Sequence, residues 1–162
     1  MHHSIAETFA EAAKDSRYLR AVLVVGGTTV RQADSLSHIK WANFDEWVNS
    51  GSDQCPRADT RRDDIAIWLF TSGSTGHPKG AVHLQHDLPY NTEVFAKRTM
   101  GVNENDLTVS VPKLFFGYAT GTNLLFPFAV GGATALFAER STPEKMFGVI
   151  DRYRPTILTT VP

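Results

Sequence analysis

The N-terminal third of the chain carries two different hydrophobic patterns. Apolar residues recur at helical spacing among strong helix formers over residues 5–14, which predicts a helix. An unbroken apolar run at residues 21–25 (AVLVV) is followed by two glycines, a pattern typical of a strand buried on both faces. Asn43 is placed to cap a short helix over residues 44–49.

From residue 65 onward, strand and helix patterns alternate. Short apolar runs predict strands at residues 65–70, 107–111, 133–138 and 156–161, and helices are predicted between them at residues 87–99, 120–129 and 143–154. Such alternation with short connections indicates an α/β domain with a mainly parallel sheet and flanking helices. The polar residues 50–64 have no periodicity and are predicted to form a linker or surface loop.

Composition excludes several functional classes. The 162 residues are 42% hydrophobic and 20% charged with a net charge of -1, which is ordinary for a globular domain and lacks the basic excess of a nucleic-acid-binding protein. No apolar window approaches a membrane span and no signal peptide is visible, so we expect a cytoplasmic protein without a membrane partner. Residues 1–4 resemble the remnant of an expression tag, so His2 and His3 predict no metal site.

Cys55 is the single cysteine, and it lies in the polar stretch 50–64. It has no cysteine partner for a disulfide, and no neighbouring histidine or helix start supports it as a nucleophile. We expect an exposed loop cysteine in a reducing compartment.

The stretch TSGSTGHPKG, residues 71–80, follows the predicted strand 65–70. Its glycines permit positive φ and allow successive amides to point at one anion, its hydroxyls add neutral donors, and Lys79 adds a compact cation. Ligands of open α/β sheets bind beyond the carboxyl ends of the strands, where this stretch is predicted to lie. The predicted phosphate-binding residues are Thr71, Ser72, Gly73, Ser74, Thr75, Gly76, Lys79 and Gly80.

Two well-known nucleotide motifs do not match this stretch. Read as GxxxxGK[ST] from Gly73, it places Pro78 where glycine is required and Gly80 where a Mg²⁺-binding hydroxyl is required. The dinucleotide pattern GxGxxG is absent as well. A flexible surface loop rich in glycine and serine is the alternative without function.

The stretch closely resembles the signature [ST]-[ST]-G-[ST]-T-G-x-P-K-G of the adenylate-forming superfamily, which includes acyl-CoA synthetases, adenylation domains of peptide synthetases and luciferases. All nine constrained positions match. The resemblance implies that residues 1–162 are part of the N-terminal, AMP-binding domain of such an enzyme. It also implies that Lys79 and Thr75 are catalytic.

A second stretch narrows the resemblance. Residues 112–128 (PKLFFGYATGTNLLFPF) are similar to the segment that lines the carboxylate pocket in benzoate-CoA and hydroxybenzoate-CoA ligases. The rings of Phe115, Phe116 and Tyr118 around the small residues Gly117 and Ala119 would form a flat slot for an aromatic acid. A place in the hydrophobic core is the alternative for Phe115 and Phe116. We expect Trp68 in the core. The predicted substrate-binding residues are Phe116, Gly117, Tyr118 and Ala119.

The resemblance implies that an aromatic carboxylate reacts with ATP to give an acyl-adenylate and pyrophosphate, and that coenzyme A then forms the thioester. It places the carboxylate ligand of Mg²⁺, the ribose contact and a C-terminal lysine further along the parent chain, so no metal ligand is predicted here. The chain ends at Pro162 directly after an apolar run, which suggests a fragment that is inactive without the rest of its parent. A fatty acyl-CoA synthetase, an adenylation domain and a non-catalytic phosphate-binding module remain alternatives.

Overall fold

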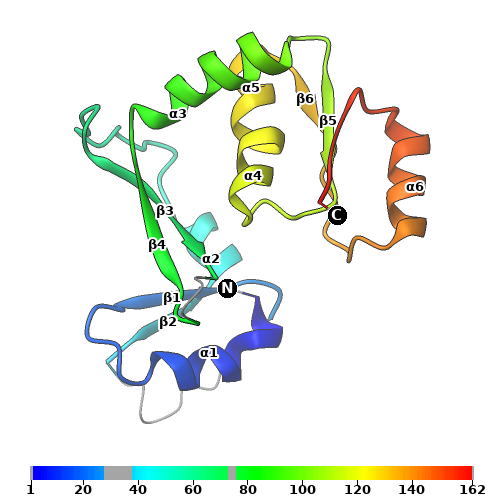
Figure 1. Cartoon of the computed structure of the whole chain (residues 1–162). Coiled ribbons are helices and arrows are strands. Elements are labelled where there is room, and N and C mark those ends of the chain that lie inside the picture. Colours follow the sequence, from blue (N-terminus) through cyan, green and yellow to red (C-terminus); the bar gives the residue numbers. More distant parts are fainter. Residues whose placement is uncertain (1, 28–37, 73–75, 162) are drawn as a thin grey trace. The chain divides into compact units, whose positions relative to one another are not determined.

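The computed structural model describes residues 2–27, 38–72 and 76–161 (Figure 1). The chain forms two compact units, Met1–Ala58 and Asp59–Pro162, and each is described by itself.

The first unit is a small parallel sheet with helices. Its elements are η1 (His3–Ile5), α1 (Ala6–Ala13), β1 (Ala21–Val24), β2 (Lys40–Asn43) and α2 (Phe44–Asn49). β1 pairs in parallel with β2, and Val22 and Val24 are buried with Ile39 and Ala13. The predicted helix at 5–14 and the strand at 21–25 are confirmed, whereas β2 was missed because its sequence KWAN has no apolar run.

The start of α2 matches its prediction. The side-chain oxygen of Asn43 accepts hydrogen bonds from the backbone N–H groups of Asp45 and Glu46, at 2.9 and 3.1 Å. Two amides that lack partners within the helix are thereby satisfied, which is the reason that asparagine is favoured at this position.

The second unit contains a hairpin, a three-stranded parallel sheet and its helices. Its elements are β3 (Ile65–Thr71), β4 (Lys79–Leu84), α3 (Asp87–Asn91), η3 (Thr92–Met100), β5 (Leu107–Ser110), α4 (Gly117–Thr120), η4 (Gly121–Leu125), α5 (Phe126–Val130), β6 (Ala133–Thr134), α6 (Pro143–Tyr153) and β7 (Ile157–Thr159).

The strand predicted at residues 65–70 forms an antiparallel hairpin with β4, which the sequence did not predict (Figure 1). Alternate residues of a strand point to opposite faces. Ile67 and Leu69 are half-buried, whereas Trp68 and Phe70 are 56% and 72% exposed. The prediction that Trp68 lies in the core is therefore wrong: it belongs to the exposed face of the hairpin in the described structure.

The parallel sheet has the order β6-β5-β7, with helices on both faces. Val109 of β5 is fully buried against Met146 and Val149 of α6. Ser110, which points to the opposite face, is hydrogen-bonded to the side-chain amide of Asn123 in η4, which lies 2.8 Å from the Ser110 hydroxyl. The α/β fold with parallel strands is confirmed, although β6 is shorter than the strand predicted at 133–138.

Each long predicted helix is present, and two of the three contain a π-helical segment. The helix predicted at 87–99 comprises α3 and the π-helix η3, in which the Thr99 hydroxyl donates to the Val94 carbonyl five residues earlier. The helix predicted at 120–129 begins earlier, as α4, and contains the π-helical segment η4. The helix predicted at 143–154 is α6, capped as expected by Thr142, whose hydroxyl oxygen accepts from the Lys145 amide at 3.3 Å.

Candidate functional site

The predicted phosphate-binding stretch connects the two strands of the hairpin. Thr71 at the end of β3 pairs with Lys79 at the start of β4, and Gly76 between them has a φ of +81°. Gly73, Ser74 and Thr75 lie outside the described residues. Lys79 is exposed and forms no ion pair with any residue that the structure describes. An unpaired cation therefore lies three residues after Gly76, whose positive φ favours glycine.

Gly80 differs from the prediction in its backbone conformation. It lies within β4 and does not have a positive φ. A Cβ atom at this position would lie 3.0 Å from Cε3 of Trp68. Glycine is therefore favoured here because the indole ring of Trp68 covers the backbone, rather than because the chain turns.

The aromatic segment begins a helix. Phe116 is the residue before α4, and its ring centroid lies 4.6 Å from that of Phe115 and 6.0 Å from that of Tyr118. Phe115, Phe116 and Tyr118 are all exposed, so the core reading of the two phenylalanines is wrong, whereas Ala119 is fully buried. Of the four predicted substrate-binding residues, Ala119 is thus the one with no solvent-accessible surface.

The phosphate-binding stretch and the aromatic segment lie close together. A Cβ atom on Gly117 would lie only 2.9 Å from Cδ1 of Leu69, so β3 packs directly against the first residue of α4. Leu69 precedes Thr71 by two residues, about 7 Å of extended strand. The hairpin therefore brings the two candidate sites within one unit and within the reach of a small molecule.

A cavity of about 420 Å³ lies at this junction. We call it the hairpin cavity; it is bounded by Ile67, Leu69, His83, Asp87, Gly117 and Gly121, among others. Gly117, Thr120 and Gly121 share one helix face because they are three and four residues apart, and their small side chains leave the space open. The π-helical segments η3 and η4 also contribute lining residues, and interruptions of this kind are frequent at functional sites.

One end of the hairpin cavity is polar. The Asp87 carboxylate oxygen Oδ2 accepts from the Leu84 amide at 3.0 Å and lies 3.3 Å from Nδ1 of His83. The hydrogen bond from the Leu84 amide, followed by that from His83, holds the pKa of Asp87 below its usual range. The other oxygen, Oδ1, lies 3.3 Å from Nε2 of His86. Sequence reasoning missed both His83 and Asp87, because only the turn after β4 brings them together.

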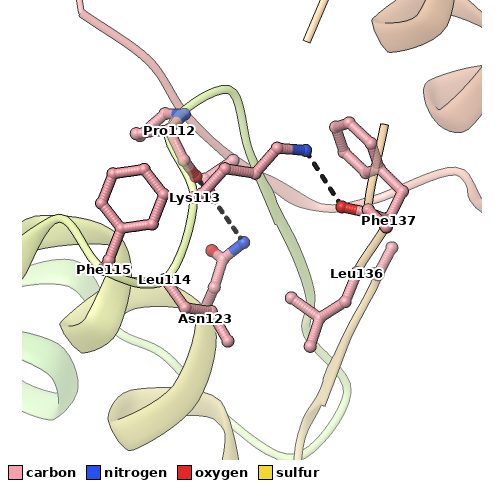
Figure 2. Close-up of a pocket in the computed structure, with 10 residues that line it drawn as sticks. Pro112, Lys113, Leu114, Phe115, Asn123, Leu136 and Phe137 are labelled. Carbon is pink, nitrogen blue, oxygen red and sulfur yellow. Dashed lines mark hydrogen bonds between the residues drawn. The ribbon is translucent and has the colours of Figure 1, made fainter. Parts of the chain in front are cut away.

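A second cavity, of about 410 Å³, lies where β5 and β6 end (Figure 2). The Lys113 ammonium donates to the Phe137 carbonyl at 3.0 Å and lies 3.5 Å from the centre of the Phe137 ring. Burial lowers the pKa of Lys113. Neither of the two cavities is lined by Phe116 or Tyr118, and the second has no lining residue from the hairpin.

Comparison with known proteins identifies the family. The model of the family described as AMP-binding enzyme matches residues 2–162. The chain belongs to this family. The AMP-binding chain is 46% identical over 113 residues to a benzoate–CoA ligase of Thauera aromatica, which covers 70% of the chain and 21% of that relative. It is 35% identical over 152 residues to a 4-hydroxybenzoate–CoA/benzoate–CoA ligase of Rhodopseudomonas palustris, covering 94% of the chain and 26% of the relative.

Solved structures agree with this assignment. The AMP-binding chain superimposes on an anthranilate CoA ligase in complex with anthranoyl-AMP with a TM-score of 0.83 and 26% identity, over 97% of the chain and 29% of that protein. A benzoate CoA ligase from Burkholderia xenovorans gives a TM-score of 0.73 and 29% identity, over 94% of the chain and 32% of that protein. The chain thus spans about a fifth to a third of the length of these relatives. In the parts that the structure describes, no helix is both long and apolar enough to cross a bilayer.

Proposed function

We propose that the complete protein carrying this chain is an ATP-dependent aryl-CoA ligase. It joins an aromatic carboxylate to AMP with loss of pyrophosphate and then transfers the acyl group to coenzyme A. The relatives named above act on benzoate, 4-hydroxybenzoate and anthranilate. The single observation that carries the proposal is the contact between Leu69 and Gly117, because it lies between the predicted substrate segment and the predicted phosphate-binding turn.

The hairpin turn is assigned to the phosphates. ATP supplies the anhydride that is broken and pyrophosphate as the leaving group. In the described part of the turn, Lys79 meets the charge that develops on the phosphates, and the backbone around Gly76 directs amides toward them. Thr71 and Ser72 add hydroxyl donors, and we assign Thr75, outside the described residues, to the same catalytic group.

The aromatic acid is assigned to the hairpin cavity. Its ring lies beside Gly117 and against Leu69, and its carboxyl end is directed toward the turn. The cavity volume of about 420 Å³ falls within the range of small-molecule sites, roughly 300–1,000 Å³. Phe116 and Tyr118 present exposed rings at the start of α4 and are assigned to the mouth of this site.

We assign no ligand of Mg²⁺ and no contact of coenzyme A to the described residues. Among the described residues, no three His, Cys, Asp or Glu side chains are grouped to hold a metal ion. The resemblance to adenylate-forming enzymes places the metal ligand further along the parent chain, so we assign the metal ligands and the coenzyme A contacts to the rest of the protein.

The proposal is tested by pyrophosphate release. The complete protein is incubated with MgATP and one acid at a time, from a panel of benzoates and of aliphatic acids that includes acetate and long-chain acids. Aromatic acids are expected to give the higher kcat/KM. A response to aliphatic acids alone would favour a fatty acyl-CoA synthetase and contradict the proposal.

A further inference from the structure

The hairpin cavity has polar lining residues at one end, and an unsubstituted aromatic ring could not form hydrogen bonds with them. Ile67, Leu69 and Phe95 are apolar walls, whereas His83 and Asp87 face the same space. A polar group that loses water without gaining a hydrogen bond is unfavourable, and a site of this kind selects ligands that supply the missing partner. The polar residues at this end are therefore expected to influence which ring substituents the site accepts.

The Asp87 contacts determine which nitrogen of His83 carries the proton. Oδ2 of Asp87 already accepts from the Leu84 amide at 3.0 Å and lies 3.3 Å from His83 Nδ1. An ionised carboxylate can only accept, so Nδ1 must be the N–H donor of this pair. In the neutral imidazole, Nε2 is then an acceptor, and no residue in the described parts of the chain is hydrogen-bonded to it.

Asp87 itself is held in place from outside the cavity. Its Oδ1 lies 3.3 Å from Nε2 of His86, and Nδ1 of His86 lies 2.9 Å from the Arg62 carbonyl and 3.2 Å from Oδ1 of Asp63. His86 does not line the cavity. Both oxygens of Asp87 thus have protein partners, whereas Nε2 of His83 has no hydrogen-bond partner among the described residues. The Tyr90 hydroxyl and the Asn91 amide also line the cavity.

We propose that His83 determines ring specificity by accepting, at Nε2, a hydrogen bond from a hydroxyl or amino substituent on the aromatic acid. Asp87 is the positioning residue that selects the tautomer. This inference rests on the proposed function of the cavity. It predicts that the preferred substrate is a hydroxybenzoate or an aminobenzoate rather than benzoate, toluate or a halobenzoate of similar size.

The test compares wild type and variants of the complete protein by pyrophosphate release. Benzoate and the three positional isomers each of hydroxybenzoate and aminobenzoate are the substrates. His83→Leu is expected to lower kcat/KM for the best substituted acid by about 10- to 100-fold more than it lowers kcat/KM for benzoate, mainly through KM. His83→Gln, whose amide oxygen can accept the same bond, is expected to restore part of the preference.

His38→Leu is the matched control. It removes a histidine from the unit Met1–Ala58, which contributes no residue to the lining of the cavity, so the preference for the substituted acid should persist. An equal loss for benzoate and for the substituted acid in His83→Leu would overturn the inference and leave the proposed function intact. So would a wild-type enzyme that prefers benzoate to all six substituted acids, a result that needs no variant to fold. If no aromatic acid releases pyrophosphate, the proposed function fails, and the inference fails with it.

Discussion

Gly117 combines two roles at one position. Its missing side chain lets Leu69 approach the start of α4, and the same position is part of the floor of the hairpin cavity. A larger side chain at this position would both clash with Leu69 and reduce the volume of the cavity.

We predict that Gly117→Val destabilises the protein and impairs adenylation of aromatic acids. The new Cβ would start 2.9 Å from Leu69 Cδ1, and overpacking of this kind costs about 1–3 kcal/mol. Urea unfolding measures the loss of stability. Gly148→Ala in α6 is the control, because no atom lies within 4 Å of its Cβ position, and it should raise stability by about 0.5–1 kcal/mol. Unchanged stability in Gly117→Val would mean that the Leu69 contact is not close in solution.

Lys79 is the second residue with a direct prediction. Lys79→Ala should lower the rate of adenylation by about 10²-fold or more, as loss of one preorganised group at a developing charge does elsewhere. Binding of the aromatic acid alone, measured by calorimetry, should remain nearly unchanged because Lys79 lies at the turn and does not line the hairpin cavity. Equal losses in both measurements would mean that the hairpin turn has a structural role only.

At the scale of the elements, one acid joins the loop before β5 to the strand β7. Asp106 accepts from the Asn103 amide at 2.9 Å and from the Thr156 hydroxyl at 2.7 Å, and that hydroxyl oxygen in turn accepts from the Leu107 amide. The Asn103 amide, and then the Thr156 hydroxyl, hold the pKa of Asp106 below its ordinary value. This contact spans 50 residues of sequence and helps to set the β5–β7 pairing.

We predict that Asp106→Ala lowers the melting temperature at neutral pH. A carboxyl group whose pKa is lower in the folded than in the unfolded state stabilises the fold above its unfolded pKa, and this contribution is lost as the pH falls through the folded value. The difference in Tm between wild type and Asp106→Ala should therefore shrink below about pH 4. Glu104→Gln, a change at an exposed neighbour, is the control, and a difference that is constant with pH would contradict the role of the charge.

At the scale of the whole molecule, the chain covers only part of the length of its relatives, and we expect it to hold only part of a nucleotide site. We predict that the 162-residue chain by itself binds MgATP with a dissociation constant of about a millimolar or weaker and forms no thioester. Three or four charge-assisted hydrogen bonds contribute about 1.5–3 kcal/mol each, against an association cost of about 4–15 kcal/mol. Isothermal titration calorimetry measures the constant, and a micromolar value would contradict this prediction.

Much of the fold was predictable from local pattern. The caps at Asn43 and Thr142 and the helices behind them were expected because capping depends on a few adjacent residues. The antiparallel pairing of β3 with β4 was not, because an apolar run such as IAIWLF reads the same whether one face or both faces are buried. Trp68 was misplaced for this reason, and β2 was missed because its short sequence has no period.

The sequence by itself determined the chemistry of the hairpin turn, since glycines, hydroxyls and a lysine within ten residues need no distant partner to indicate a phosphate. It also determined the aromatic character of residues 115–118. Only the tertiary structure decided that these two stretches adjoin, through Leu69 and Gly117, and that the local pair of His83 and Asp87 lines the cavity at this junction. The reason is physical: local motifs depend on neighbouring residues, whereas the cavity depends on the packing of the β3–β4 hairpin against η3 and α4, which come later in the chain.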